Sequence, residues 1–199
     1  RLVDFGKALS NTRITAAKKL SEDVTKALKS LYMPNAYFDV SLNTGRYTKH
    51  GCDEVEFVIC TNVGEEAKPL CKIASGGELS RIMLGIKSVL SDKDNVDTLI
   101  FDEIDTGISG RAAGAVGIKL KELSKVRQII CVTHLAQIAA FADNHLLIEK
   151  DVQNNRTYTK IKSLSGDERV TEIARIMSGT DMTENLFNSA KELLDRSKI

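Results

Sequence analysis

Apolar residues along the chain change repeatedly between the spacing of a helix and the alternation of a strand. Apolar positions three and four residues apart predict an amphipathic helix, whereas alternation over four to eight residues predicts a half-buried strand. At 199 residues, the chain is long enough for one well-buried domain with an appendage. The predicted helices are 1–31, 78–90, the segment around 113–123, 135–142, 167–178 and 184–197, and the predicted strands are 37–43, 54–61, 98–102, 129–133, 145–152 and 157–164. The helix around 113–123 places four apolar residues on one face: Ala113, Val116, Leu120 and Leu123. Residues 153–155 join the last two strands as a hairpin, and Gly179 is the predicted C-cap between the last two helices.

The first predicted helix, 1–31, places its apolar residues roughly along one stripe that runs from Leu2 to Leu31. The spacing drifts between three and four residues, without the three or four clean heptads that a coiled coil needs. By pattern alone, this is a surface helix packed on the rest of the protein. Pro34 ends it, because the residue before a proline avoids the helical region.

The strands 37–43 and 54–61 form a predicted hairpin, joined by the polar loop 44–53. The loop carries a small basic cluster: Arg46, Lys49 and His50. Such a cluster is either a solvated loop tip or a contact for the phosphates of DNA. The sequence leaves both interpretations open.

Two short apolar strands, 98–102 and 129–133, enclose a helix. Strand, helix and strand in this order predict a parallel crossover unit. The first strand ends in two adjacent carboxylates, Asp102 and Glu103, and the second is followed by His134. Because open α/β sheets place their ligands at the carboxyl ends of parallel strands, these side chains are candidate site residues. The alternative for the carboxylates is a helix cap or a solvated turn, and for the histidine a structural role.

The helix 78–90 opens with the sequence A-S-G-G-E. Ser75 and Glu78, three residues apart, predict a capping box that holds the free amides of the first turn. The cap does not explain Gly76 and Gly77, since each glycine within a helix costs about 1 kcal/mol relative to alanine. Bare amides at a helix N-terminus form a site for a phosphate. The turn is therefore either an anion site or simply a capped helix start.

Composition narrows the class of protein. A formal net charge of +1, with 42% hydrophobic and 28% charged residues, is typical of an ordinary globular protein without a global signal for nucleic acid. The four cysteines have no C-x-x-C spacing, which favours free thiols in a reducing cytoplasm over a zinc site or disulfides. No apolar run approaches the ~18 residues of a membrane span, and no secretory signal is visible. The chain begins at Arg1 rather than methionine, which indicates a piece of a longer protein.

Three motifs in order, A-S-G-G-E-L-S-R, F-D-E-I-D-T-G-I-S-G and V-T-H-L-A-Q-I-A, resemble the ATP-binding-cassette (ABC) ATPases, and within them the SMC-like chromosome and repair proteins. The resemblance runs from about Ala8 to the C-terminus. It implies an α/β fold, the C-terminal lobe of a P-loop (ABC/SMC-type) ATPase head, with a mostly parallel sheet flanked by helices. It also implies a division into a coiled-coil stub helix at 1–33 and the lobe at 34–199.

The resemblance assigns a role to each candidate residue. Asp102 matches the Walker B aspartate, which helps hold Mg²⁺, and Glu103 matches the catalytic glutamate, which orients or deprotonates the attacking water. His134 matches the switch histidine that senses the γ-phosphate. Asp105 opens a loop that crosses to the opposite subunit, and it is expected to be one of the nucleotide-binding residues. The signature turn then contacts ATP held by a partner head through four residues: Ser75, Gly76, Gly77 and Glu78.

One motif of such an ATPase is missing from the chain. A phosphate loop G-x-x-x-x-G-K-[ST] appears nowhere, and the Gly-Lys pair at Gly6 is followed by Ala8. In SMC-like proteins this Walker A loop lies in the N-terminal half. The resemblance therefore implies three partners: an N-terminal lobe of the same protein, a second head that shares two ATP molecules, and DNA ends or single-stranded regions at the nucleoid. It implies a role in repairing double-strand breaks, and a chain that alone neither binds ATP tightly nor hydrolyses it.

Two alternatives remain open. One is a head that uses ATP only as a clamp on DNA, with little hydrolysis; an intact Glu103 argues against it. The other is the ATPase subunit of a membrane transporter, which normally carries the phosphate loop and the signature turn on one continuous chain.

Overall fold

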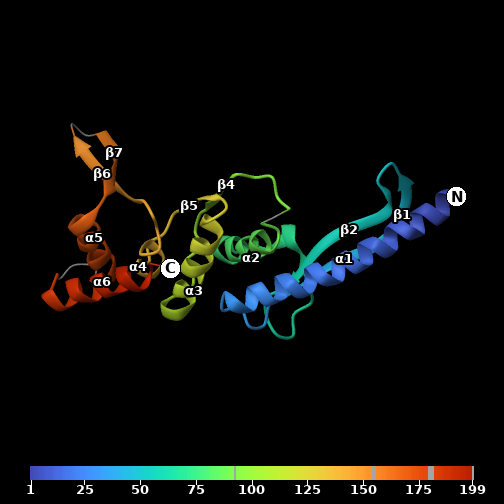
Figure 1. Ribbon diagram of the computed structural model, residues 1–199, viewed down its shortest axis with the longest axis horizontal. Coiled ribbons are helices and arrows are strands. Elements are labelled where there is room, and N and C mark those ends of the chain that lie inside the picture. The colour runs from blue at the N-terminus through green and yellow to red at the C-terminus, as the bar shows by residue number, and fades with distance from the viewer. Residues whose placement is uncertain (92, 154–155, 179–181, 199) are drawn as a thin grey trace.

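The computed structural model is an elongated α/β protein whose elements follow one another along its long axis (Figure 1). The structure describes residues 1–91, 93–153, 156–178 and 182–198. Within them, the strands form three separate sheets, and the buried apolar side chains form three separate clusters. The elements are α1 (Leu2–Ser30), β1 (Tyr37–Thr48), β2 (Gly51–Cys60), β3 (Lys68–Pro69), the 3-10 helix η1 (Leu70–Lys72), α2 (Gly76–Val89), β4 (Thr98–Phe101), α3 (Gly110–Ser124), β5 (Gln128–Cys131), α4 (Ala136–Ala139), β6 (His145–Gln153), β7 (Arg156–Leu164), α5 (Gly166–Ser178) and α6 (Glu184–Arg196).

The long helix α1 confirms the helix predicted at 1–31, but only its C-terminal half contributes fully buried apolar side chains. Val24 and Leu28 are fully buried in one cluster with residues of β1, β2 and α2. Leu2 and Phe5, on the same predicted stripe, are exposed. The apolar stripe is continuous in the sequence, whereas the buried cluster reaches only the last turns of α1. The N-terminal half contacts the hairpin of β1 and β2 instead.

The hairpin of β1 and β2 is longer than predicted. Its turn lies at Lys49 and His50, so most of the expected loop 44–53 is strand. The reason is a contact with α1, in which the carboxylate of Asp53 accepts hydrogen bonds from Ser10 at 2.5 Å and Arg13 at 2.7 Å. The pattern of a single segment cannot reveal such a contact with a distant helix.

The strands β4 and β5 confirm the predicted crossover. They pair in parallel, with Thr98 opposite Gln128 and Phe101 opposite Cys131. The helix α3 joins them and buries its four predicted apolar residues: Ala113, Val116, Leu120 and Leu123.

The fold class is the expected one, but parallel pairing is limited to these two strands in the described part of the chain. The sheet of β1, β2 and β3 and the sheet of β6 and β7 are antiparallel. The expectation of a mostly parallel sheet therefore does not hold for this chain by itself. Short connections allow only antiparallel neighbours, and among these strands only β4 and β5 are linked by a crossover helix.

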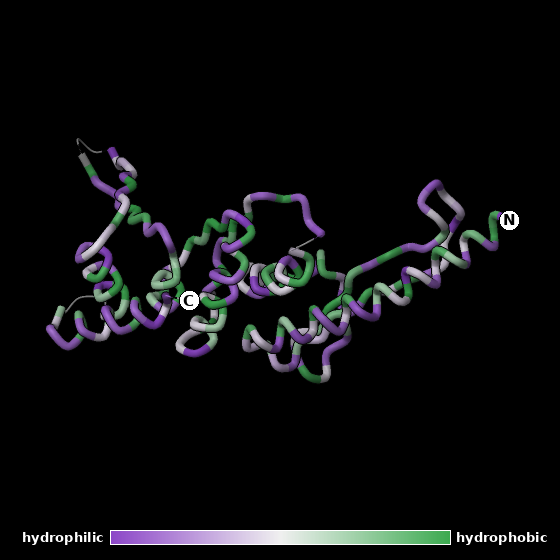
Figure 2. The backbone as a smooth tube through the Cα atoms, viewed as in Figure 1, coloured by the Kyte–Doolittle hydropathy of each residue, from purple (hydrophilic) through white to green (hydrophobic). Residues whose placement is uncertain are grey.

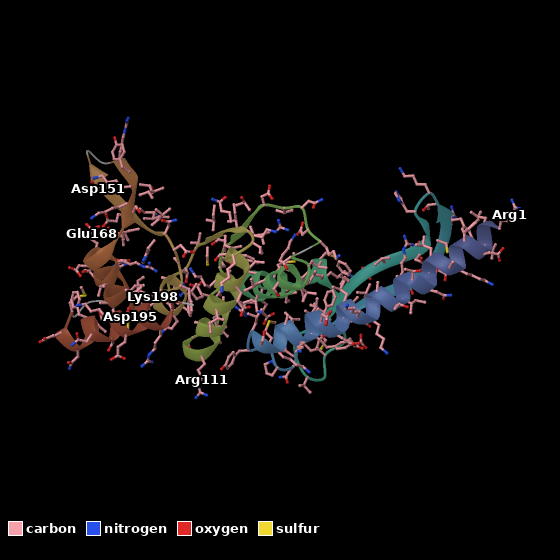
Figure 3. The ribbon with its side chains drawn as sticks, viewed as in Figure 1. Arg1, Arg111, Asp151, Glu168, Asp195 and Lys198 are labelled. Atoms are coloured by element: carbon pink, nitrogen blue, oxygen red, sulfur yellow. The ribbon has the colours of Figure 1, made fainter. Side chains whose placement is uncertain are left out.

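The C-terminal part combines the hairpin of β6 and β7 with the helices α4, α5 and α6. The three helices share a buried cluster, and Lys162 of β7 donates to Glu168 at 2.6 Å. Glu168 lies at the start of α5, next to the hairpin (Figure 3). The helix predicted at 135–142 is shorter, at Ala136–Ala139. The predicted hairpin tip at 154–155 and the predicted helix cap at Gly179 lie outside the described residues.

The elongated arrangement leaves a large surface exposed. The accessible surface is 13042 Å², whereas a compact monomer of 21.9 kDa has about 9,300 Å². Apolar residues are spread along the whole length rather than gathered at one centre (Figure 2). In the part of the chain that the structure describes, no helix is both long and apolar enough to span a membrane.

Candidate functional site

The N-terminus of α2 and the loop that follows β4 lie against each other, so two of the motifs meet. Ser75 is the N-cap of α2, and its hydroxyl accepts the amide of Glu78 at 3.4 Å, as the capping pattern predicts. Ser75 and Gly76 are exposed, whereas Gly77 is buried. The turn therefore has an outer side, where amides of the first helical turn face solvent, and an inner side against the loop.

The two glycines are explained by this close approach. A Cβ atom at Gly76 would stand 2.4 Å from Oε2 of Glu103. A Cβ atom at Gly77 would stand 2.9 Å from the carbonyl oxygen of Thr106 and 3.0 Å from that of Glu103. The sequence predicted that these glycines admit a close neighbour, and within this chain the neighbour is the loop after β4.

The carboxylates of Asp102 and Glu103 are both exposed at the carboxyl end of β4. Oδ1 of Asp102 accepts the amide of Glu103 at 2.9 Å, which leaves Oδ2 for another ligand. Glu103 has a φ of 55°, in the left-handed region that is unfavourable for a residue with a side chain. This backbone conformation turns the Glu103 side chain toward Gly76 at the start of α2.

Asp105 and His134 form a second group. The carboxylate of Asp105, which follows β4, joins the loop after β4 to the residues that follow β5. Oδ2 of Asp105 accepts the Thr133 hydroxyl at 2.6 Å and the His134 amide at 2.7 Å, and it lies 3.0 Å from Nδ1 of His134. Asp105 is only 3% exposed, whereas the His134 side chain is 74% exposed. With Nδ1 directed at Asp105, Nε2 is the ring nitrogen left for an outside partner. Asp105, expected to contact nucleotide, is here turned inward and positions the histidine.

Arg81 is a part of this site that the motif roles do not mention. It is 6% exposed, and its Nη1 donates to the carbonyl oxygens of Ile104 at 3.2 Å and Thr106 at 2.8 Å. Beside it, the hydroxyl of Ser80 donates to the carbonyl oxygen of Asp102 at 2.7 Å. The sequence contained a signal for this contact. Arg81 is four residues after Gly77 and so faces the same side of the helix, where the glycine allows a close neighbour.

The side chains at this edge have the chemistry of hard-cation ligands rather than soft ones. Burial raises the pKa of the Cys131 thiol to about 12, and the charges of Asp105 and Asp102 act in the same direction. The thiol is therefore neither a thiolate nucleophile nor a metal ligand at neutral pH. Among the described residues, no group of three or more histidine, cysteine and acidic side chains is arranged to hold a metal ion. Asp102 therefore offers a single carboxylate, which suits Mg²⁺ bound mainly by phosphates and water.

The basic cluster of the first hairpin is distant in the sequence from the signature turn and the carboxylates. Arg46 is at the end of β1, and Lys49 and His50 form the turn; all three are exposed. The hairpin tip rests on α1, where the ring of Tyr47 approaches Gly6. The structure thus places the cluster at an exposed tip, which is compatible with both interpretations.

Relatives cover nearly the whole chain. The DNA repair protein RecN of Bacillus subtilis is 43% identical over 205 residues, which span 95% of this chain and 36% of the relative. RecN of Haemophilus influenzae is 45% identical over 190 residues, spanning 94% and 34%, and RecN of Treponema pallidum is 44% identical over 201 residues, spanning 98% and 35%. The chain therefore spans about a third of the length of the curated relatives it matches, in their C-terminal part. No family model matches the chain.

Solved structures share the fold at low sequence identity. An Smc head domain with a coiled coil from Pyrococcus yayanosii aligns with a TM-score of 0.58 and 19% identity, over 93% of this chain and 31% of that one. A chain solved for work on the ATP-driven dimerization and DNA-stimulated activation of SMC ATPases aligns with a TM-score of 0.53 and 20% identity, over 86% of this chain and 99% of that one.

The fold is that of the SMC head domains. Identities above 40% with the RecN proteins, over nearly the whole chain, show which family it is. The chain belongs to the family of the DNA repair protein RecN.

Proposed function

We propose that this chain is the C-terminal half of an SMC-like ATPase head that works in the repair of DNA double-strand breaks at the nucleoid. It supplies the signature turn, the Walker B carboxylates and the switch histidine. An N-terminal lobe of the same protein supplies the Walker A loop, and two complete heads enclose two ATP molecules. Engagement and release of the heads are coupled to DNA ends or single-stranded regions. The observation that carries this proposal is the meeting of an exposed helix N-terminus with two exposed carboxylates at the end of β4.

The residues at the start of α2 and at the carboxyl ends of β4 and β5 each have a role in ATP hydrolysis. The exposed amides and hydroxyl at Ser75 and Gly76 bind the γ-phosphate held by the partner head, since a helix N-terminus favours an anion. Oδ2 of Asp102 holds Mg²⁺, which when bound neutralises charge on the phosphates. The carboxylate of Glu103 orients the attacking water and accepts its proton. His134, held by Asp105 through Nδ1, directs Nε2 toward the phosphate.

The exposed apolar residues of the strands support the proposal that a second lobe packs on this chain. Ile100 of β4 and Ile130 of β5 are exposed on the parallel pair, and the hairpin of β6 and β7 exposes Leu146, Ile148 and Ile161. An isolated two-stranded hairpin is marginally stable in water unless something packs on it. An N-terminal lobe that covers these strands accounts for the excess surface, and it brings the phosphate loop to the same edge.

The first test is Glu103→Gln in the complete protein. The amide keeps the size and hydrogen bonding of the side chain but cannot accept the proton. We expect ATP to bind and the heads to engage, with turnover lowered by something like 10²–10⁴-fold. A stable ATP-bound head dimer on size-exclusion chromatography is the expected product.

Ser75→Arg is the complementary variant, because it blocks the helix N-terminus that must approach the partner's nucleotide. Each head should still bind ATP, but dimerisation and turnover should both fail. If Ser75→Arg dimerises and hydrolyses ATP at the parental rate, the turn is only a capped helix start, and the proposed function loses its main support.

The two alternatives respond differently to the same assays. The relatives are DNA repair proteins, so the transporter alternative is set aside. A clamp that barely hydrolyses ATP would dimerise with ATP in the parental protein and show no further loss of turnover in Glu103→Gln. The 199-residue chain tested alone should show no Mg²⁺-dependent turnover, and co-expression with the N-terminal lobe should restore it.

A further inference from the structure

We propose that Arg81 is a positioning residue that joins the signature turn to the carboxylates of its own lobe, so that the two move as one unit. The proposal rests on the proposed function, because it assigns the turn to a partner's nucleotide and the carboxylates to the lobe's own. Arg81 touches neither nucleotide; it acts through the loop between Asp102 and Thr106.

The first support is the environment of the guanidinium. Arg81 is 6% exposed, and the partners of its Nη1 are two backbone carbonyls, those of Ile104 and Thr106. In the part of the chain that the structure describes, none of the ion pairs includes Arg81, and its buried Nε has no partner. Burial lowers the pKa of Arg81, and only the nearby charge of Glu78 opposes this. Burying a cation without an ion pair is costly, so stability alone is a poor reason for an arginine here.

The second support is that Arg81 does not act alone on the loop. Ser80 donates to the carbonyl oxygen of Asp102, one residue before Glu103. The absent side chain of Gly77 lets the carbonyl oxygens of Glu103 and Thr106 approach the helix closely. The loop is therefore held by consecutive positions of α2 at both of its ends, and Arg81 holds the end beyond Glu103.

The consequence follows from the geometry of Glu103. Its Oε2 lies over Gly76, at the helix N-terminus where the phosphate of a partner's ATP is proposed to bind. Two anions cannot share that position, so the arriving phosphate displaces the carboxylate toward its own site. The displacement is useful only if the loop backbone stays fixed while the side chain moves, because a misplacement of about 1 Å costs on the order of 10²-fold in rate. Arg81 fixes that backbone.

The test variant is Arg81→Lys in the complete protein. Lysine keeps the positive charge but offers a compact ammonium in place of the planar fork that bridges carbonyls. The matched control is Arg127→Lys. Arg127 also uses one Nη2 atom to bridge two backbone carbonyls, those of Ser91 and Asp94, but at the opposite end of α2.

For Arg81→Lys we expect kcat to fall by about 10–100-fold, while the KM for ATP and ATP-dependent dimerisation stay within about threefold of the parental values. Hydrogen exchange of peptides that cover residues 102–109 should speed up. Arg127→Lys should lower the melting temperature by about as much as Arg81→Lys does. It should change neither kcat nor the hydrogen exchange of residues 102–109. If the role of Arg81 were purely structural, both variants would lose stability, and ATP binding, dimerisation and turnover would fall in proportion to that loss.

The two measurements separate failure of this inference from failure of the proposed function. Unchanged exchange in residues 102–109 of Arg81→Lys overturns the inference, whatever the turnover. Faster exchange with a kcat within about twofold of parental also overturns it, because the loop would then move without consequence. A parental protein that never hydrolyses ATP refutes the proposed function instead, and the exchange comparison still decides whether Arg81 holds the loop.

Discussion

Gly76 and Gly77 are adjacent, yet different kinds of atom exclude a side chain at each. At Gly76, the obstacle is Oε2 of Glu103, the far end of a flexible side chain. At Gly77, the obstacles are the Cβ atom of Thr106 and the backbone carbonyls of Glu103 and Thr106, and the Thr106 carbonyl accepts a hydrogen bond from Arg81 of α2. The pair therefore combines a position that admits a movable neighbour with a position that fixes the loop.

This difference predicts unequal costs for two alanine substitutions. Gly77→Ala forces the loop away from α2, and we expect it to lower the free energy of unfolding by about 1–3 kcal/mol, the usual cost of overpacking. Gly76→Ala should be near neutral, because the gain of up to about 1 kcal/mol in helix propensity offsets the displacement of Glu103. Urea denaturation of both variants measures the difference. Equal costs would mean that the loop adjusts as easily as a side chain does.

At the scale of elements, the first hairpin depends on α1 for its length. Asp53 of β2 is joined to Ser10 and Arg13 of α1, and the guanidinium also donates to the carbonyl oxygen of His50 at 2.6 Å. These hydrogen bonds, that of the Ser10 hydroxyl first and that of Arg13 next, lower the pKa of Asp53 below its usual value. The charged form of this carboxylate is therefore favoured in the folded state.

The lowered pKa gives this contact a defined pH dependence. A carboxyl group whose pKa is lower in the folded than in the unfolded state adds stability above its unfolded pKa of about 3.9. That stability is lost as the pH falls through the lower, folded pKa. We therefore expect Asp53→Asn to lower the melting temperature at neutral pH, and the difference from the parent to shrink as the pH falls below about 3.9.

The matched control for that measurement is Asp23→Asn, because Asp23 is an exposed aspartate on α1, the helix that Asp53 contacts. It should change the melting temperature little at any pH. A constant difference for Asp53→Asn across the whole range would show that the amide disturbs packing rather than the charged contact.

At the scale of the whole molecule, the lobe is organised as three successive cores rather than one. Apolar side chains remain exposed on the strands, as at Ile100 of β4 and along the hairpin of β6 and β7. Exposed apolar side chains that gather on neighbouring strands are typical of an interface. In the proposed function, the N-terminal lobe covers them.

The chain by itself should therefore self-associate and bind a hydrophobic dye. Ile148 and Ile161 face each other across the hairpin and are 59% and 66% exposed, so the double variant Ile148→Thr, Ile161→Thr should reduce both effects without unfolding the protein. Light scattering and dye fluorescence measure the change. Val63→Thr, at an exposed loop position, is the control and should change neither. A clean monomer with little dye binding at high concentration would contradict the proposal.

Local patterns determined the helices, the parallel crossover and the cap at Ser75, because periodicity and capping depend on residues a few positions apart. The same logic placed Asp102, Glu103 and His134 at strand ends, since the covalent order of strand, helix and strand fixes which ends coincide. Likewise, the buried face of α3 follows from the spacing of its apolar residues alone.

Only the tertiary structure decided what those residues do to one another. The contacts of Ser80 with Asp102 and of Asp105 with Thr133 join residues 22 and 28 positions apart, beyond the reach of any local pattern. The inward turn of Asp105, the burial of Arg81 and the reason for Gly77 all come from such contacts. Their physical cause is packing: α2 approaches the loop after β4 so closely that backbone carbonyls, invisible to side-chain patterns, decide which residues fit.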